Sequence, residues 1–211
     1  GEQIKTGLFG NQKEQVIDLS YTKPFFKQDN QKLILASKYE NRKTKAFLTN
    51  QAKVSATVER QLTPKWTAGL GGSVLQARVT SFNLDSSTSK DNYSLGSVPF
   101  YVIHDTRNDV LNPKRGKLVE LNLEPFFFLG SGSKPFMKSE ISGSTYFHKK
   151  AKFSPTIAVK ASIGTILGSN SRQIPRTERF YVGGNNSLRG YGYQLASDID
   201  PNKRPIGGRS F

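Results

Sequence analysis

The sequence predicts an all-β, antiparallel fold, and three observations support this prediction. Apolar and polar residues alternate with a period of two in segments spread along the chain, as in a strand whose two faces meet different surroundings. Glycine, proline and small polar residues separate these segments and favour turns. No segment repeats apolar residues at helical spacing for more than two turns, so a parallel sheet would lack its crossover helices.

The alternating segments follow one another along the chain. The clearest is 51–59, in which alanine or valine occupies every even position and a polar or charged residue occupies every odd one. The connectors between segments are of two sizes, with a short one at 62–64 and a longer one at 85–92. The other clearly alternating segments are 15–21, 66–71, 119–124 and 156–164.

The composition argues against catalytic chemistry. The chain has 211 residues, enough for one domain or part of one. It contains no cysteine and only two histidines, His104 and His148, which leaves little material for a zinc site or a Ser-His-Asp triad. We therefore expect no metal, no cofactor and no catalytic residue, and we expect that the protein is not an enzyme.

Low hydropathy does not exclude a membrane protein here. The mean hydropathy is −0.52, and the longest apolar run, 126–129, is far shorter than the roughly 18 residues of a spanning helix. A transmembrane barrel alternates lipid-facing and lumen-facing residues, so its hydropathy averages out. Several segments reach about 10 residues, as a tilted strand needs to cross a bilayer. A soluble sandwich or lipocalin-like barrel remains open on the pattern alone.

Basic residues outnumber acidic ones, with 31 Lys+Arg against 16 Asp+Glu and a formal net charge of +15. Such a balance suits nucleic-acid binding, but these charges are dispersed, without a recognition helix or a basic and aromatic stripe. We expect no nucleic-acid partner, and we expect the basic residues to face anionic lipid or to solvate loops. The loop residues concerned are Lys43, Lys45, Lys114, Arg115, Lys149, Lys150 and Lys152.

The first motif spans 105–116 and lies between two apolar segments, so we expect a strand, a turn and a second strand. Proline restricts φ, glycine permits a positive φ, and aspartate or asparagine oxygens accept hydrogen bonds from turn amides. The alternative for its acidic and basic residues is a solvated salt bridge worth at most about 1 kcal/mol. The residues of this hairpin motif are Asp105, Arg107, Asn108, Pro113 and Gly116.

The second motif spans 179–193 and is rich in glycine. Its glycines surround one arginine, giving a loop with few side chains that can pack closely against a wall and present a single cation. An ordinary glycine-rich hairpin is the alternative. The residues of this loop motif are Gly183, Gly184, Leu188, Arg189, Gly190 and Tyr191.

Together and in this order, the two motifs resemble those of the Omp85 superfamily of outer-membrane barrels, of the D15 bacterial surface antigen type. The first is similar to the family's D-x-R-N-x-x-x-x-P-x-x-G hairpin. The second is similar to its R-F-x-x-G-G-x-x-S-[VIL]-R-G-[FY] loop, which in that family folds back into the barrel lumen. Segments 15–24 and 192–194 resemble the barrel subunits of translocation and assembly modules.

The resemblance implies a transmembrane barrel of about sixteen antiparallel strands behind periplasmic POTRA domains. We count about ten strand-like segments, so we expect 1–211 to be a partial C-terminal barrel domain without POTRA domains and final strands. Gly207 and Gly208 resemble the opening of a later strand. A barrel that lacks strands cannot close, and unpaired edges are not tolerated in lipid.

The implied function is assembly, insertion or translocation of outer-membrane proteins, with client strands pairing at the barrel seam. The implied location is the bacterial outer membrane, and the implied partners are the bilayer, nascent outer-membrane or autotransporter clients and a periplasm-spanning TamB-like protein. Arg189 would meet a carboxylate on the inner wall, because a cation in a lumen needs a partner. Alternatives are a two-partner secretion channel and the barrel anchor of a patatin-like lipase. Candidate carboxylates are Glu120, Glu124 and Glu140.

Overall fold

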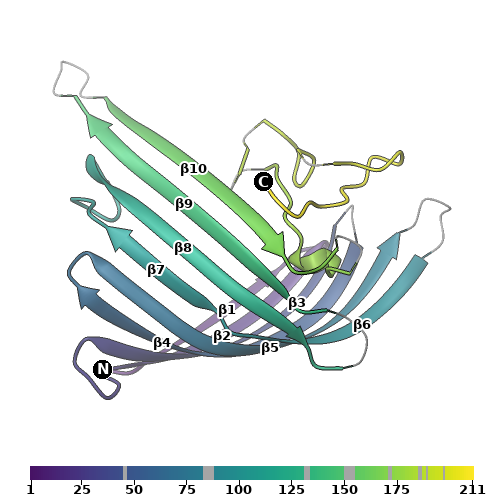
Figure 1. Cartoon of the computed structure of the whole chain (residues 1–211), viewed down its shortest axis with the longest axis horizontal. Coiled ribbons are helices and arrows are strands. Elements are labelled where there is room, and N and C mark those ends of the chain that lie inside the picture. Colours follow the sequence, from purple (N-terminus) through teal and green to yellow (C-terminus); the bar gives the residue numbers. More distant parts are fainter. Residues whose placement is uncertain are drawn as a thin grey trace.

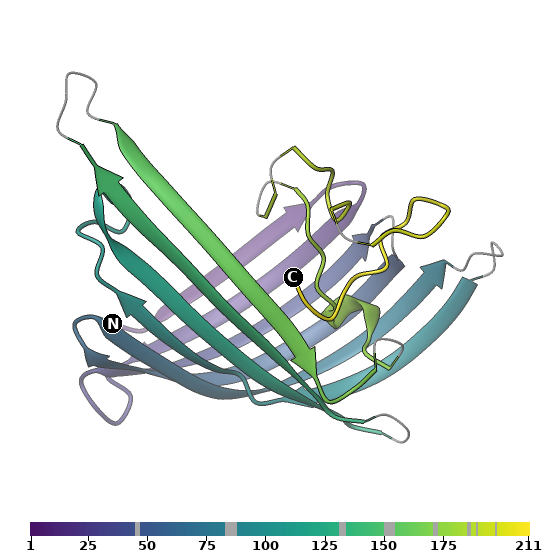
Figure 2. The same ribbon diagram turned by 45° about the horizontal axis from the view of Figure 1, so that its top comes forward.

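The computed structural model describes residues 1–44, 47–82, 88–130, 134–149, 155–170, 173–184, 187–188, 190–196 and 198–211. One antiparallel sheet dominates it and curls into an open trough, and the chain after the last strand lies on the hollow side (Figures 1 and 2). The strands are β1 (Gln3–Gly10), β2 (Glu14–Pro24), β3 (Gln31–Lys43), β4 (Phe47–Thr63), β5 (Trp66–Phe82), β6 (Thr88–Ser97), β7 (Phe100–Asp105), β8 (Arg115–Phe128), β9 (Phe136–His148) and β10 (Thr156–Leu167).

The sheet confirms the all-β, antiparallel prediction. Its order is β1-β2-β3-β4-β5-β6-β8-β9-β10, with β7 paired to β5 and β8. Consecutive strands are therefore neighbours, and successive connections lie alternately at the two rims of the trough (Figure 1). In the described part of the chain the one helix is a short 3₁₀ turn, η1 (Arg176–Glu178), and none is long and apolar enough to span a bilayer.

β6 and β7 are two halves of one path across the sheet, interrupted at residues 98–99. Pro99 has no amide hydrogen, so it cannot donate to the ladder. The neighbouring backbone groups still bond across the break: Gly71 N donates to Pro99 O at 2.9 Å and Val98 N donates to Pro125 O at 3.1 Å. The interruption therefore changes the hydrogen-bond pattern locally, but the sheet stays continuous across it.

The strands extend further than the apolar pattern indicates. Residues 88–92 belong to β6, although we expected a connector over 85–92, and β4 continues to Thr63. Backbone hydrogen bonds form the ladder whatever the side chain, and 88–92 pair in register with 78–82 of β5. Polar strand ends therefore project beyond the apolar part of the sheet. Residues 83–87 lie outside the described part.

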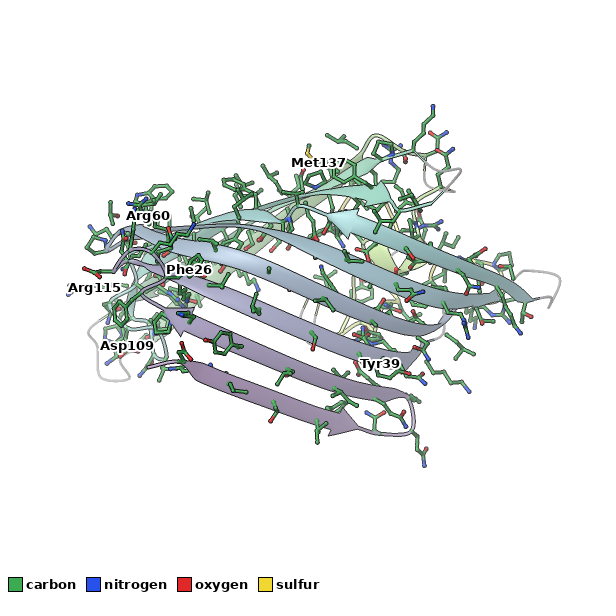
Figure 3. The ribbon with its side chains drawn as sticks, turned by 90° about the horizontal axis from the view of Figure 1, so that it is seen from below. Phe26, Tyr39, Arg60, Asp109, Arg115 and Met137 are labelled. Atoms are coloured by element: carbon green, nitrogen blue, oxygen red, sulfur yellow. The ribbon has the colours of Figure 1, made fainter. Side chains whose placement is uncertain are left out.

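The convex face of the sheet is apolar and exposed (Figure 3). Val54, Leu70 and Val74 of β4 and β5 are 61%, 55% and 51% exposed, whereas a soluble sheet would bury such a face. On β4 the central apolar residues of this face, Ala52 to Val58, are bracketed by Asn50 and Arg60, ten steps apart (60 − 50). At about 3.3 Å per residue and a tilt of about 40°, this stretch covers about 25 Å, the height of a lipid-facing band.

The buried core lies on the opposite, concave face. Its main cluster joins strand residues such as Leu75, Leu95 and Phe126 to Ile174 and Phe180, which follow the last strand. The chain after β10 therefore packs against the inner wall and does not extend into solvent. This packing places Phe180, near the start of the second motif, inside the trough.

Candidate luminal site

The inner wall carries buried and half-buried charges that satisfy one another. Lys53 Nζ lies 3.2 Å from Glu124 Oε1, to which Ser97 Oγ donates at 2.6 Å, and Ser73 Oγ lies 2.7 Å from Ser97 Oγ. These groups come from β4, β5, β6 and β8, so the network crosses four strands. Such pairing is what allows polar side chains to line a wall that is shielded from water.

A second network lies nearer the rim that holds the β4–β5 turn. Lys32 Nζ is 2.7 Å from Glu59 Oε1, and the Tyr101 hydroxyl donates to Glu59 Oε2 at 2.5 Å. The Tyr101 ring occupies the space above Gly69, where a Cβ atom would overlap the ring. Glycine at this position is therefore required by the close approach of an aromatic side chain.

The three carboxylates expected to face the lumen all lie on the concave face of β8 and β9. Glu124 is engaged by Lys53, and Glu120 Oε2 accepts a hydrogen bond from Ser142 Oγ at 3.4 Å. Glu140 forms no ion pair with any residue in the described ranges. Arg189, the cation expected to reach one of them, lies outside the described residues, so its pairing stays a prediction.

The chain turns back into the trough directly after β10. Gly168 has φ +99°, and a Cβ atom there would lie 2.8 Å from Pro135 O. The buried Ser169 hydroxyl donates to Lys134 O at 2.9 Å. These contacts tie the bend to the chain just before β9 and direct the following residues inward.

Lys138 of β9 holds the returning segment against the wall. Its Nζ atom lies 3.6 Å from Glu178 Oε2 and 5.2 Å from the centre of the Phe180 ring. Phe180 is 8% exposed, and the Tyr93 hydroxyl bonds to Thr177 Oγ1 from the neighbouring wall. Phe180, the second residue of the second motif, is therefore fixed against the wall, and the glycines of the motif follow it in the sequence.

Arg179 organises the backbone of this segment. Its Nε donates to Ile174 O at 3.1 Å and its Nη1 donates to Ile206 O at 3.1 Å, so one guanidinium joins residues on both sides of the loop. Burial lowers the pKa of Arg179 from its ordinary value. The Tyr181 hydroxyl donates to Arg176 O at 2.9 Å, and burial raises the pKa of Tyr181 to about 12.

The glycines of the loop motif adopt conformations that favour glycine. Gly183, Gly184 and Gly190 have φ of +119°, +100° and +95°. At Gly183 a Cβ atom would also lie 2.5 Å from Gly192 O, whereas Gly190 has open space around it. Gly184 N donates to Tyr191 O at 3.1 Å, which closes the loop upon itself.

Leu188 and Tyr191 of the same motif are exposed, at 46% and 59%. Tyr191 N donates to Leu188 O at 3.4 Å. The tail of the loop reaches β3, where Arg42 Nη1 donates to the Tyr193 hydroxyl at 3.4 Å. Arg42 also pairs with the buried Glu40, with Nε 2.9 Å from Oε1.

The last residues of the chain pair with β10. Ile166 N donates to Arg209 O at 2.7 Å, and Phe211 N donates to Gly164 O at 3.1 Å. The Phe211 and Phe180 rings lie 4.7 Å apart over Gly164, where a Cβ atom would overlap them. Residues 209–211 therefore form a short antiparallel bridge with β10, and Gly208 pairs with Phe180.

The first motif forms the expected turn between β7 and β8. The Asp105 carboxylate accepts from Arg107 Nε at 3.0 Å and from Arg107 Nη2 at 2.7 Å. Asn108 Oδ1 accepts from the backbone of Lys114 and Arg115, both at 2.9 Å. Asp105 also accepts from Arg107 N at 2.9 Å, so both Asp105 and Asn108 bond to backbone amides of the turn.

Two further residues complete this hairpin. Gly116 has φ +98°, and a Cβ atom there would overlap Thr106 O. Pro113 is half-buried in the turn. Backbone hydrogen bonds from Asn112 and Leu111 hold the pKa of Asp109 below its usual range. The hairpin residues therefore form a structural turn, and among the described residues no three His, Cys, Asp or Glu side chains gather to hold a metal.

Comparison with known proteins agrees with this geometry. The Omp85 superfamily domain matches residues 1–211. The chain belongs to the Omp85 superfamily. A SAM50-like protein of Schizosaccharomyces pombe is 30% identical over 117 residues, which are 54% of this chain and 24% of that protein. The crystal structure of BamA from Haemophilus ducreyi lacking POTRA domains 1–3 has the same fold, with a TM-score of 0.83 and 18% identity.

This Omp85 chain matches the BamA structure over 100% of its own length and 46% of that chain. It thus spans less than half the length of either relative. The agreement confirms the superfamily and the barrel fold, while the closer likeness to translocation and assembly modules stays a prediction.

Sequence reasoning did not identify several residues that hold the Omp85 loop in place. Lys138, Glu178 and Arg42 lie outside both motifs, and their partners are distant along the chain. Arg179 and Phe180 were within the second motif, but their roles were not predicted. Lys138 lies two residues after the buried Phe136, so both side chains share one face of β9. A lysine at such an inward-facing position is the signal that could have identified it.

Proposed function

We propose that this protein assembles or inserts proteins of an outer membrane. The observation that supports the proposal is the fixed luminal segment. Phe180 of the second motif packs on the inner wall against Lys138, and Arg179 beside it joins the backbone of the segment, while the outer face of the sheet is apolar. A lipid-facing wall with an internal loop can guide a chain into the bilayer without covalent chemistry. Membership of the superfamily and the names of the two relatives support the same reading.

We further propose that client strands pair with the barrel at its seam. Backbone groups of a client entering lipid need partners, and a strand edge supplies them in register. The client class is nascent outer-membrane or autotransporter proteins, and the protein itself acts without catalytic residues. The loop motif, including Arg189, would keep the wall in the shape that accepts a client.

We place the protein in a bacterial outer membrane, with a periplasm-spanning TamB-like partner. The support is the likeness of segments 15–24 and 192–194 to barrel subunits of translocation and assembly modules. The 30% identical relative comes from a yeast, so the superfamily alone does not select the organelle or the organism.

The test measures client folding in cells that carry the intact protein. Depletion should lower the fraction of client barrels that show heat-modifiable migration, and Arg189→Ala should reproduce most of that loss. Lys90→Ala is the matched control, because Lys90 is exposed and forms no ion pair with a described residue. Unchanged client folding combined with loss of a soluble protein from the medium would instead indicate a secretion channel.

A further inference from the structure

We propose that one rim of the convex face is a binding site for anionic phospholipid headgroups. The site, which we call the basic rim, consists of Arg60, Lys65, Arg115 and Lys117, at the same end of the sheet as Trp66. It deepens the proposed membrane function, on which it rests, by naming the lipid class and the residues that contact it.

The register brings these residues to the same end of the sheet. Trp66 of β5 pairs with His104 of β7, which pairs with Val119 of β8, two residues from Lys117. Arg60 projects from the convex face of the adjacent strand β4. Figure 3 shows Arg60 and Arg115 at the same end of the sheet, far from Tyr39 at the other end.

The basic rim carries cations that no described carboxylate neutralises. Arg60, Lys65, Arg115 and Lys117 are exposed and take part in none of the ion pairs among the described residues. Glu59 and Asp105 are their acidic neighbours in sequence or register, but both point to the concave face, where Lys32 and Arg107 engage them.

Two carboxylates do lie in turns at this rim. Asp109 Oδ1 accepts from the amides of Leu111 and Asn112, so its charge is partly compensated by the turn. Asp29 lies in the β2–β3 turn beside Asn30, whose backbone oxygen accepts from Gln61 N next to Arg60, but Asp29 forms no ion pair with a described residue. The four cations therefore exceed the acidic groups near them, and the excess favours a negatively charged ligand.

The position of the basic rim relative to the apolar band selects a lipid as that ligand. Trp66 is 44% exposed and lies 4.2 Å from the His104 ring, with the amphipathic character of residues at a membrane interface. The regular apolar alternation of β4 ends with Val58, so Arg60 marks the end of the central apolar band, and only the exposed Leu62 lies beyond it on this strand. Lipid phosphates lie just beyond the hydrocarbon that such a band faces. Long basic side chains can reach those phosphates while their stems stay on the apolar surface.

Trp66 is the single tryptophan of the chain, so it reports directly on the site. The intact protein is reconstituted in phosphatidylcholine vesicles containing phosphatidylglycerol, with bromine on the acyl chains of one lipid or the other. The Trp66→Phe variant gives the background fluorescence of any tryptophan elsewhere in the protein, and this background is subtracted. We expect brominated phosphatidylglycerol to quench Trp66 at least about fivefold more effectively than its mole fraction predicts, the preference that a single cation beside a headgroup gives at about 1 kcal/mol.

Two triple variants test the residues. Arg60→Gln, Arg115→Gln and Lys117→Gln together should abolish the preference. Lys13→Gln, Arg78→Gln and Lys90→Gln together remove the same charge from the other rim and should leave the preference intact. Equal losses in the two variants, or a preference that survives 1 M salt unchanged, would overturn the site. Equal quenching by both lipids would also overturn it, while quenching by neither lipid would instead overturn the membrane location itself.

Discussion

The Nζ atom of Lys138 lies 5.2 Å from the centre of the Phe180 ring and 3.6 Å from Glu178 Oε2, so one cation of the wall holds two neighbours of the luminal segment. Lys138 is 26% exposed and Glu178 15% exposed, which limits the screening of their interaction by water. The segment therefore has an electrostatic anchor beside its apolar one.

Replacing Lys138 by methionine should loosen the segment. The change removes the cation–π contact and leaves Glu178 without its cation, at an expected cost of about 1–2 kcal/mol in the free energy of docking. The measurement is the rate of limited proteolysis after residue 173 in the folded protein. Lys90→Met is the control, and Lys138→Arg should retain most of the protection. Equal cleavage rates for Lys138→Met and the wild type would show that Lys138 does not hold the luminal segment against the wall.

Gly116→Ala should destabilise the hairpin between β7 and β8. Its φ of +98° disfavours alanine, and the new Cβ would overlap Thr106 O. We expect a loss of about 2–4 kcal/mol in the free energy of unfolding, measured by urea titration in detergent with heat-modifiable migration as the readout. Gly130→Ala, at a glycine with open surroundings, should change stability by less than about 0.5 kcal/mol.

A matched pair separates close packing from backbone conformation in the loop motif. Gly183 and Gly190 both have positive φ, but only Gly183 faces an obstacle, with Gly192 O 2.5 Å from its ideal Cβ position. Gly183→Ala should therefore cost about 1–3 kcal/mol more than Gly190→Ala in the same urea titration. Similar costs for the two variants would mean that backbone conformation alone selects glycine here.

Alkaline pH should release the luminal segment through Tyr181. Burial raises the pKa of its hydroxyl to about 12, above the ordinary value of 10.0 in the unfolded chain. The folded state therefore keeps the neutral phenol, and this stabilisation is complete below pH 10 and is lost as the pH rises toward 12.

Tyr181→Phe should remove that part of the pH dependence and cost about 1 kcal/mol at neutral pH, because the bond to Arg176 O is lost. Protease sensitivity of the segment, measured from pH 8 to 12 in both proteins, gives the comparison. Parallel pH profiles would show that other groups control the release.

The motifs predicted the kind of structure better than they predicted its contacts. The hairpin over 105–116 follows from local chemistry, because Asp105, Asn108 and Gly116 act on backbone groups within the same turn. The luminal loop was expected to centre on Arg189, yet in the described residues the anchoring is done by Arg179 and Phe180. Arg179 bonds to Ile174 and Ile206 of the returning segment, and Phe180 contacts Lys138 of the wall; the motif contains none of these partners.

Alternation of apolar and polar residues by itself determined the central parts of several strands and their two unlike faces, because side-chain direction in a strand depends only on parity. The lack of helical segments determined that the sheet is antiparallel. Turn chemistry likewise determined the hairpin at 105–116. Only the tertiary structure decided which wall residues meet the luminal segment. Lys138 is 40 residues from Glu178 (178 − 138), and Arg42 is 151 residues from Tyr193. Such pairs depend on the curvature of the sheet and on the return of the chain after β10, and no local pattern encodes either.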